Sequence, residues 1–75
     1  MKAIETHYLG PTDRKGSRLV ASDGDGNRVT IPYPSDLDPE AAHLKAALAL
    51  KLKMDWKGRL MQGSTRTGYA FIFVD

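Results

Sequence analysis

The stretch that decides the fold reads Thr67-Gly68-Tyr69-Ala70-Phe71-Ile72-Phe73-Val74-Asp75. Alternation along a strand places neighbouring side chains on opposite faces of a sheet. One face here carries Tyr69, Phe71 and Phe73, and the other carries Ala70, Ile72 and Val74. Both faces are apolar, which is typical of a strand in the middle of a sheet. We expect the aromatic face to lie under a helix, and an exposed platform for stacking is the alternative.

The sequence predicts one helix before this strand, from residue 39 to about residue 55. Asp38 is a typical N-cap, Pro39 suits the first helical position, and Glu40 places an acid in the first turn. At about 100° per residue, one apolar stripe is expected to pack on the sheet. It consists of Ala41, Leu44, Leu48 and Leu52. A weaker stripe, expected on the opposite, exposed side, consists of Ala46, Ala47, Leu50 and Met54, with His43 among them.

Four more strands are predicted, at residues 2–9, 18–22, 28–33 and 59–62, before a last strand at 69–74. The segment Asp23-Gly24-Asp25-Gly26-Asn27 joins two of them, because its Asp-Gly pairs supply the positive φ angles of a tight hairpin. Pro32 and Pro34 lack amide donors, so the third strand ends there or lies at a sheet edge. We therefore predict an α+β fold of order βββαββ, with one helix packed on an antiparallel sheet, as a single domain of residues 1–75.

The composition favours a small cytoplasmic protein. The chain has 75 residues, no cysteine and a formal net charge of +2. A core of this size contributes little stability, and self-association is one way to add to it. The first five residues lack the apolar segment of a signal peptide, and no run is long and apolar enough to span a membrane. We expect a protein of the cytoplasm without a membrane segment, since disulfides are also absent.

Charge is distributed unevenly along the chain. Residues 23–40 carry a net charge of −4, whereas residues 45–66 carry +5. One interpretation is a solvated surface, since acids suit helix starts and bases suit helix ends. The other is that a basic side meets an acidic partner. The candidate partner-binding residues are then Lys51, Lys53, Lys57 and Arg59, with Leu50 and Met54 from the weaker stripe. This stripe is also a candidate surface for a homodimer.

No group of residues suggests catalysis or a bound metal. Residues 23–27 copy the first ligand positions of a calcium loop, but Arg28 and Pro34 stand where that loop needs glycine and glutamate. His7 and His43 are too few for a metal site, and neither has a serine or carboxylate beside it at a catalytic spacing. We expect no enzymatic activity, no cofactor and no metal.

A surface for single-stranded nucleic acid is the alternative function. The run Gly68-Tyr69-Ala70-Phe71-Ile72 resembles the middle of the RNP1 signature of RNA-recognition motifs, whose alternate aromatics stack on bases. Thr67 and Val74 depart from that signature, and the chain ends at Asp75 where that fold continues with a helix and a strand, so we do not assign the family. Aromatic platforms also occur on other small sheets. The candidate nucleic-acid-binding residues are Arg14, Lys15, Arg66, Tyr69, Phe71 and Phe73.

Four segments carry a resemblance that spans nearly the whole chain. They are Met1-Lys2-Ala3-Ile4-Glu5-Thr6-His7-Tyr8-Leu9-Gly10-Pro11-Thr12, Gly16-Ser17-Arg18, Ala42-His43-Leu44-Lys45-Ala46-Ala47 and Gly68-Tyr69-Ala70-Phe71-Ile72-Phe73. They resemble a group of small uncharacterised proteins from phages and plasmids of Proteobacteria. The resemblance implies a mobile-element origin. By analogy with anti-CRISPR and anti-restriction proteins, it implies an inhibitor that binds and blocks a host protein or ribonucleoprotein complex.

Overall fold

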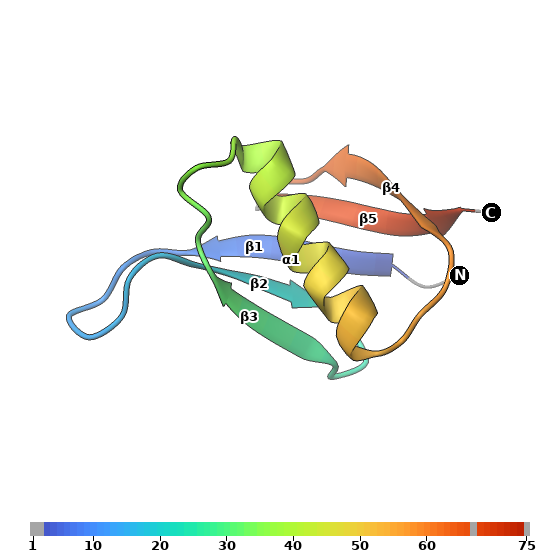
Figure 1. The fold of residues 1–75 in the computed structure, drawn as a ribbon, viewed down its shortest axis with the longest axis horizontal. Helices are drawn as coiled ribbons and strands as arrows, with labels where there is room; N and C mark the ends of the chain where they lie inside the picture. The colour runs from blue at the N-terminus through green and yellow to red at the C-terminus, as the bar shows by residue number, and fades with distance from the viewer. Residues whose placement is uncertain (1–2, 67, 75) are drawn as a thin grey trace.

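The computed structural model describes residues 3–66 and 68–74 of the chain. Its elements are β1 (Ala3–Leu9), β2 (Arg18–Ser22), β3 (Arg28–Pro32), α1 (Pro39–Lys53), β4 (Arg59–Ser64) and β5 (Gly68–Val74). The strands form one antiparallel sheet in the order β3-β2-β1-β5-β4, and α1 crosses one face of it diagonally (Figure 1). The predicted α+β fold of order βββαββ is confirmed. Residue 2 of the predicted first strand, and residues 67 and 75 of the stretch that decides the fold, lie outside the described residues.

Local signals place the helix and the hairpin as predicted. Asp38 Oδ1 accepts the N–H of Ala41 at 2.8 Å, and Pro39 begins α1. In the hairpin between β2 and β3, Gly24 and Gly26 have φ angles of 84° and 98°. The hairpin prediction is confirmed, because these left-handed conformations cost glycine little.

The core lies between α1 and the sheet, and α1 presents a different face to it than the one predicted. The buried apolar residues packed together there are Ile4, Leu19, Ala21, Ala42, Ala46, Ala47, Leu50 and Phe71. Leu48 and Leu52, which we expected in the core, are 45% and 82% exposed, and Leu50 is fully buried. The predicted helix face is therefore wrong at Leu48 and Leu52, whereas Leu44 of the same stripe packs against the core. The physical reason is that the small alanine side chains let the helix backbone lie close to the sheet, while the two leucines occupy the outer side.

The aromatic face of β5 is the helix side of the sheet. Phe71 is fully buried, and Tyr69 and Phe73 are half-buried against the core. The expectation that these aromatics lie under the helix is confirmed. The other side of the sheet, called the open face below, is not covered by α1 (Figure 1). Register places on it Ala3, Glu5, His7 and Leu9 of β1, Arg18, Val20 and Ser22 of β2, Arg28, Thr30 and Pro32 of β3, Arg59, Met61 and Gly63 of β4, and Gly68, Ala70, Ile72 and Val74 of β5.

No helix within residues 3–66 and 68–74 is long and apolar enough to cross a membrane.

Candidate partner-binding surface

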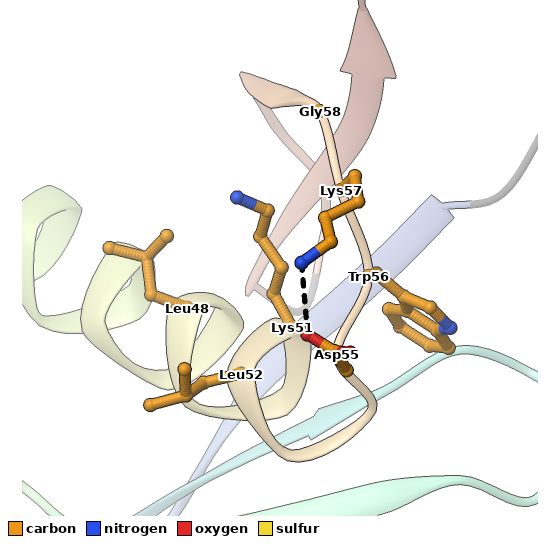
Figure 2. A pocket seen from close by; sticks show the side chains of 7 residues that line it. All are labelled: Leu48, Lys51, Leu52, Asp55, Trp56, Lys57 and Gly58. Atoms are coloured by element: carbon orange, nitrogen blue, oxygen red, sulfur yellow. Dashed lines mark hydrogen bonds and ion pairs between the residues drawn. The ribbon is translucent and has the colours of Figure 1, made fainter.

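A hollow of about 390 Å³ lies where α1 ends and the chain turns towards β4. It is called the helix-end hollow below, and its lining residues are Leu48, Lys51, Leu52, Asp55, Trp56, Lys57 and Gly58. Figure 2 shows the two leucines on one side, the indole ring on the other, and the two lysines between them. The hollow therefore combines exposed apolar surface with positive charge.

The apolar side of the hollow is the outer side of α1. Leu52 is 82% exposed and Leu48, one turn before it, is 45% exposed. Single exposed leucines are common on protein surfaces, but two at this spacing form a continuous strip. On the opposite side, Trp56 packs edge to face on Phe73, with ring centroids 5.9 Å apart. The side chain of Trp56 therefore lines the hollow and also packs against the core.

The way the helix ends gives the hollow its shape. Asp55 adopts a left-handed conformation with φ of 55°. Its N–H donates to the carbonyl of Leu52 at 3.1 Å, and the N–H of Trp56 donates to the carbonyl of Lys51 at 3.0 Å. These bonds are those of a Schellman motif with Asp55 as the C′ residue. The turn reverses the chain, so that Trp56 packs on the sheet side and Lys57 returns beside the helix.

The charges of the hollow are predominantly positive and well hydrated. Lys57 Nζ lies 3.1 Å from Asp55 Oδ1, and both side chains are 86% exposed. An ion pair this exposed contributes about 0–1 kcal/mol, so it holds neither side chain firmly. With Lys51 on α1, the lining carries two ammonium groups and one carboxylate. An acidic partner could therefore replace Asp55 as the counter-ion of Lys57 at little cost.

The structure brings together only part of the predicted partner-binding set. Lys51 and Lys57 line the helix-end hollow. Lys53 instead points to β3, where its Nζ donates to the carbonyl of Arg28 at 3.0 Å. Arg59 begins β4 on the open face, outside the hollow.

The two apolar residues predicted for the partner surface do not lie on an accessible apolar stripe. Leu50 is fully buried, and Met54 is half-buried as the C-cap of α1 and packs on the core. The predictions for Leu50, and for a homodimer through this stripe, are corrected for the same reason: the stripe faces the sheet.

Sequence reasoning missed the apolar half of the hollow. Leu48 and Leu52 were assigned to the core, because they fall on one side of the helix with Ala41 and Leu44. Trp56 follows the helix, where no periodicity applies. The available signal was the pair of alanines at Ala46 and Ala47 beside Leu50, a pattern that permits close packing on a sheet.

The alternative nucleic-acid set is dispersed. Its aromatic members Tyr69, Phe71 and Phe73 are on the helix side of the sheet. Arg14 and Lys15 are exposed in the loop between β1 and β2, and Arg66 is exposed in the turn between β4 and β5. The rings belong to the core, so they do not form an exposed stacking platform beside these cations.

A second hollow, of about 370 Å³, lies on the open face beside the β2–β3 hairpin. Its lining residues are His7, Val20, Ser22, Gly24, Gly26, Asn27 and Arg28. Asp23 has its carboxylate engaged by the hairpin, where it accepts the N–H groups of Asp25 and Asn27 at 2.8 and 3.2 Å. This hollow has two cationic or titratable side chains but no exposed large apolar residue in its lining.

The buried histidine is a core residue. His43 is 6% exposed, its Nδ1 lies 2.7 Å from Thr6 Oγ1, and its ring centroid lies 4.5 Å from that of Tyr69. The Thr6 hydroxyl also lies 3.3 Å from the carbonyl of Tyr69, and which partner donates in the shorter Thr6–His43 bond depends on the tautomer of the ring. Burial lowers the pKa of His43 below its ordinary value of 6.5, and the charge of His7 acts in the same direction. Across residues 3–66 and 68–74, no three histidine or carboxylate side chains gather as a metal site.

No protein-family model matches this chain, and neither a curated protein nor a solved structure gives a significant match.

Proposed function

We propose that this protein is a small interaction protein that binds an acidic, amphipathic segment of a host protein at the helix-end hollow and blocks the complex to which that protein belongs. The observation that carries the proposal is the exposure of Leu48 and Leu52, at 45% and 82%, directly beside the ammonium groups of Lys51 and Lys57. Apolar side chains rimmed by charge are typical of protein interaction sites. Positive charge selects an acidic segment and speeds its encounter with the site.

The leucines are expected to supply most of the affinity. Complete burial of a leucine side chain contributes about 1.5–3 kcal/mol, and Leu52 has most of its surface still to bury. The lysines contribute mainly to specificity and to the association rate, because exposed ion pairs add about 0–1 kcal/mol each. Changes to the leucines should therefore lower the affinity, and changes to the lysines should mainly lower the association rate.

The class of target in this proposal rests on the resemblance to phage and plasmid proteins alone. We propose that the target is a defence complex or another nucleic-acid-handling complex in the cytoplasm of a proteobacterial host. The protein would inhibit it by occlusion, as anti-CRISPR and anti-restriction proteins inhibit their targets. We propose no catalytic step. Direct binding of single strands through β5 is not proposed, because Tyr69, Phe71 and Phe73 pack under α1.

The proposal is tested by capturing the target from host cells with tagged protein and then measuring the affinity of the purified pair. A variant combining Leu48→Ser and Leu52→Ser should weaken binding at least about tenfold. A variant combining Lys51→Glu and Lys57→Glu should slow association and reverse its salt dependence, because the hollow would then repel an acidic segment. The control is Lys45→Glu, an exposed lysine of α1 outside the hollow, which should bind like the native chain. Equal binding by all variants would show that the hollow is not the site.

Titration with labelled single- and double-stranded DNA and RNA separates occlusion from direct nucleic-acid binding. With a net charge of only +2, the protein should bind no more tightly than about 10⁻⁴ to 10⁻⁶ M at about 150 mM salt. Sub-micromolar binding that is lost on changing Arg14, Lys15 and Arg66 to glutamate would contradict the proposal and favour the alternative.

A further inference from the structure

The two edges of the sheet are not equally protected. β3 and β4 are the edge strands, and β4 lies on the far side of β5 from the rest of the sheet (Figure 1). All residues of β4 except Leu60 are exposed, including Met61 at 57%. Edge strands are usually blunted by proline, by lysine or by a covering element, because their free main-chain groups pair readily with another strand. β4 contains neither proline nor lysine, and its one charged residue, Arg59, is the first of the strand.

The turn after β4 fixes which of its main-chain groups point outward. The N–H of Thr65 donates to the carbonyl of Gly68 at 2.8 Å, so these two residues form a hydrogen-bonded pair. Such pairs alternate along an antiparallel ladder. With the observed register, Arg59, Met61 and Gly63 therefore direct their main-chain groups to β5. The groups of Leu60, Gln62 and Ser64 point away from the sheet.

The β3 edge offers fewer main-chain groups than the β4 edge. The N–H of Tyr33 donates to the carbonyl of Ser17 at 3.0 Å, which directs the main-chain groups of Arg28, Thr30 and Pro32 outward. Pro32 has no N–H to offer, and the carbonyl of Arg28 already accepts from Lys53 Nζ. Only Thr30 keeps both groups for a new strand. The β4 edge thus has more outward N–H and C=O groups for pairing with a new strand than the β3 edge.

We propose that β4 pairs with β4 of a second copy of this chain, antiparallel and about a two-fold axis, to give one continuous sheet across a homodimer. A homodimer is favoured over a foreign strand because self-pairing continues an apolar row that is already in place. On the open face, Met61 lies beside Ile72, and Ile72 lies beside Ala3. Pairing at Met61 joins two such rows at the axis and covers a side chain that is 57% exposed. This inference concerns a surface separate from the helix-end hollow and goes beyond the proposed function.

Charge selects the register. With Met61 opposite Met61 of the second copy, Leu60 and Gln62 pair with their counterparts through outward main-chain groups. Arg59 then lies opposite Gly63 of the second copy, about 10 Å along the strand from its Arg66. The neighbouring register, centred on Gln62, would place Arg59 next to that Arg66 and add a repulsion. Of these two registers, charge therefore favours the one whose axis passes through Met61.

The first test measures mass in solution by sedimentation and light scattering. At about 100 µM the native chain should have twice the monomer mass. Gln62→Pro removes an outward N–H and leaves the bonds to β5 intact, so it should give a folded monomer. Thr30→Pro removes an outward N–H from the other edge and should remain dimeric. A native chain that is monomeric at that concentration, or a Gln62→Pro variant as dimeric as the native chain, would overturn the proposal.

The second test reads the register through cross-linking and does not depend on the proline variants. The chain contains no cysteine, so single-cysteine variants report on one position each. Met61→Cys should form an intermolecular disulfide on mild oxidation, because directly opposed Cα atoms of this type lie about 4.5 Å apart. Arg59→Cys should cross-link at least about tenfold more slowly, since its counterpart would lie about 14 Å away. Equal rates for the two variants would exclude the pairing.

Discussion

Replacing Leu50 and Leu48 separately by alanine tests which side of α1 forms the core. Leu50 is fully buried and belongs to the cluster that includes Ile4, Leu19 and Phe71. Leu48 is two residues earlier, on the outer side, and is 45% exposed. The two substitutions remove the same atoms from the same helix. Any difference between their effects therefore reports the environment of each side chain and not helix propensity.

The structure sets the size of the difference. Leu50→Ala loses the transfer free energy of a buried side chain and leaves a cavity, which together cost about 2–5 kcal/mol. For a chain of this size that loss lowers the melting temperature by roughly 4–8 °C per kcal/mol. Leu48→Ala should cost less than about 1 kcal/mol, because little new cavity forms and alanine is the better helix former.

The assay is urea denaturation followed by circular dichroism and by the fluorescence of Trp56, the single tryptophan of the chain. If Leu50→Ala does not fold, Leu50→Val removes less volume and should still cost more than Leu48→Ala. A larger loss for Leu48→Ala than for Leu50→Ala would refute the observed helix face. It would return the leucine stripe to the core and remove the apolar side of the helix-end hollow.

Three further outcomes follow from individual contacts. A Cβ at Gly68 would collide with the carbonyl of Thr6, so Gly68→Ala should lower the free energy of unfolding by at least about 1–3 kcal/mol, as measured by thermal melts. Gly63 has open space around it, so Gly63→Ala should change the free energy of unfolding by no more than about 0.5 kcal/mol. Burial lowers the pKa of His43, so the unfolded chain binds a proton at this residue more readily than the folded chain. The contribution to stability should be complete well above pH 6.5 and should fall as the pH drops through 6.5. Denaturation curves at several pH values should show this loss in the native chain and not in His43→Asn. Asp55 is left-handed at φ 55°, so Asp55→Val should be about 1–2 kcal/mol less stable than Asp55→Gly in thermal melts, and equal stability would exclude strain at this C′ position.

Much of the fold was predictable because local signals agree with one another. The N-cap at Asp38, the glycines of the hairpin at Gly24 and Gly26, and the alternation in β5 each act over a few residues. Together they define the order of elements. The prediction from Pro32, that the third strand ends there or lies at a sheet edge, also holds, because the cost of a missing donor depends only on the residue itself.

The helix face could not be predicted, because it depends on contacts between distant segments. α1 has apolar side chains on most of its circumference, so periodicity supports more than one buried face. The choice is made by the surface of the sheet, where Ile4, Leu19 and Phe71 leave room for alanines and for Leu50. Because the wrong helix face was predicted, the apolar side of the helix-end hollow was missed. Lys51 and Lys57 were identified from charge, while Leu48 and Leu52 were assigned to the core.

The most direct measurement of the central claim is site-specific photo-cross-linking in host cells, with a photo-reactive phenylalanine at position 52 or at position 13. Leu52 is the most exposed apolar residue of the hollow, and Asp13 is exposed in the distant β1–β2 loop. We expect one dominant adduct at position 52, formed with an acidic segment of a host protein, and no such adduct at position 13. Equal labelling at both positions, no adduct at position 52, or an adduct to nucleic acid there would contradict it.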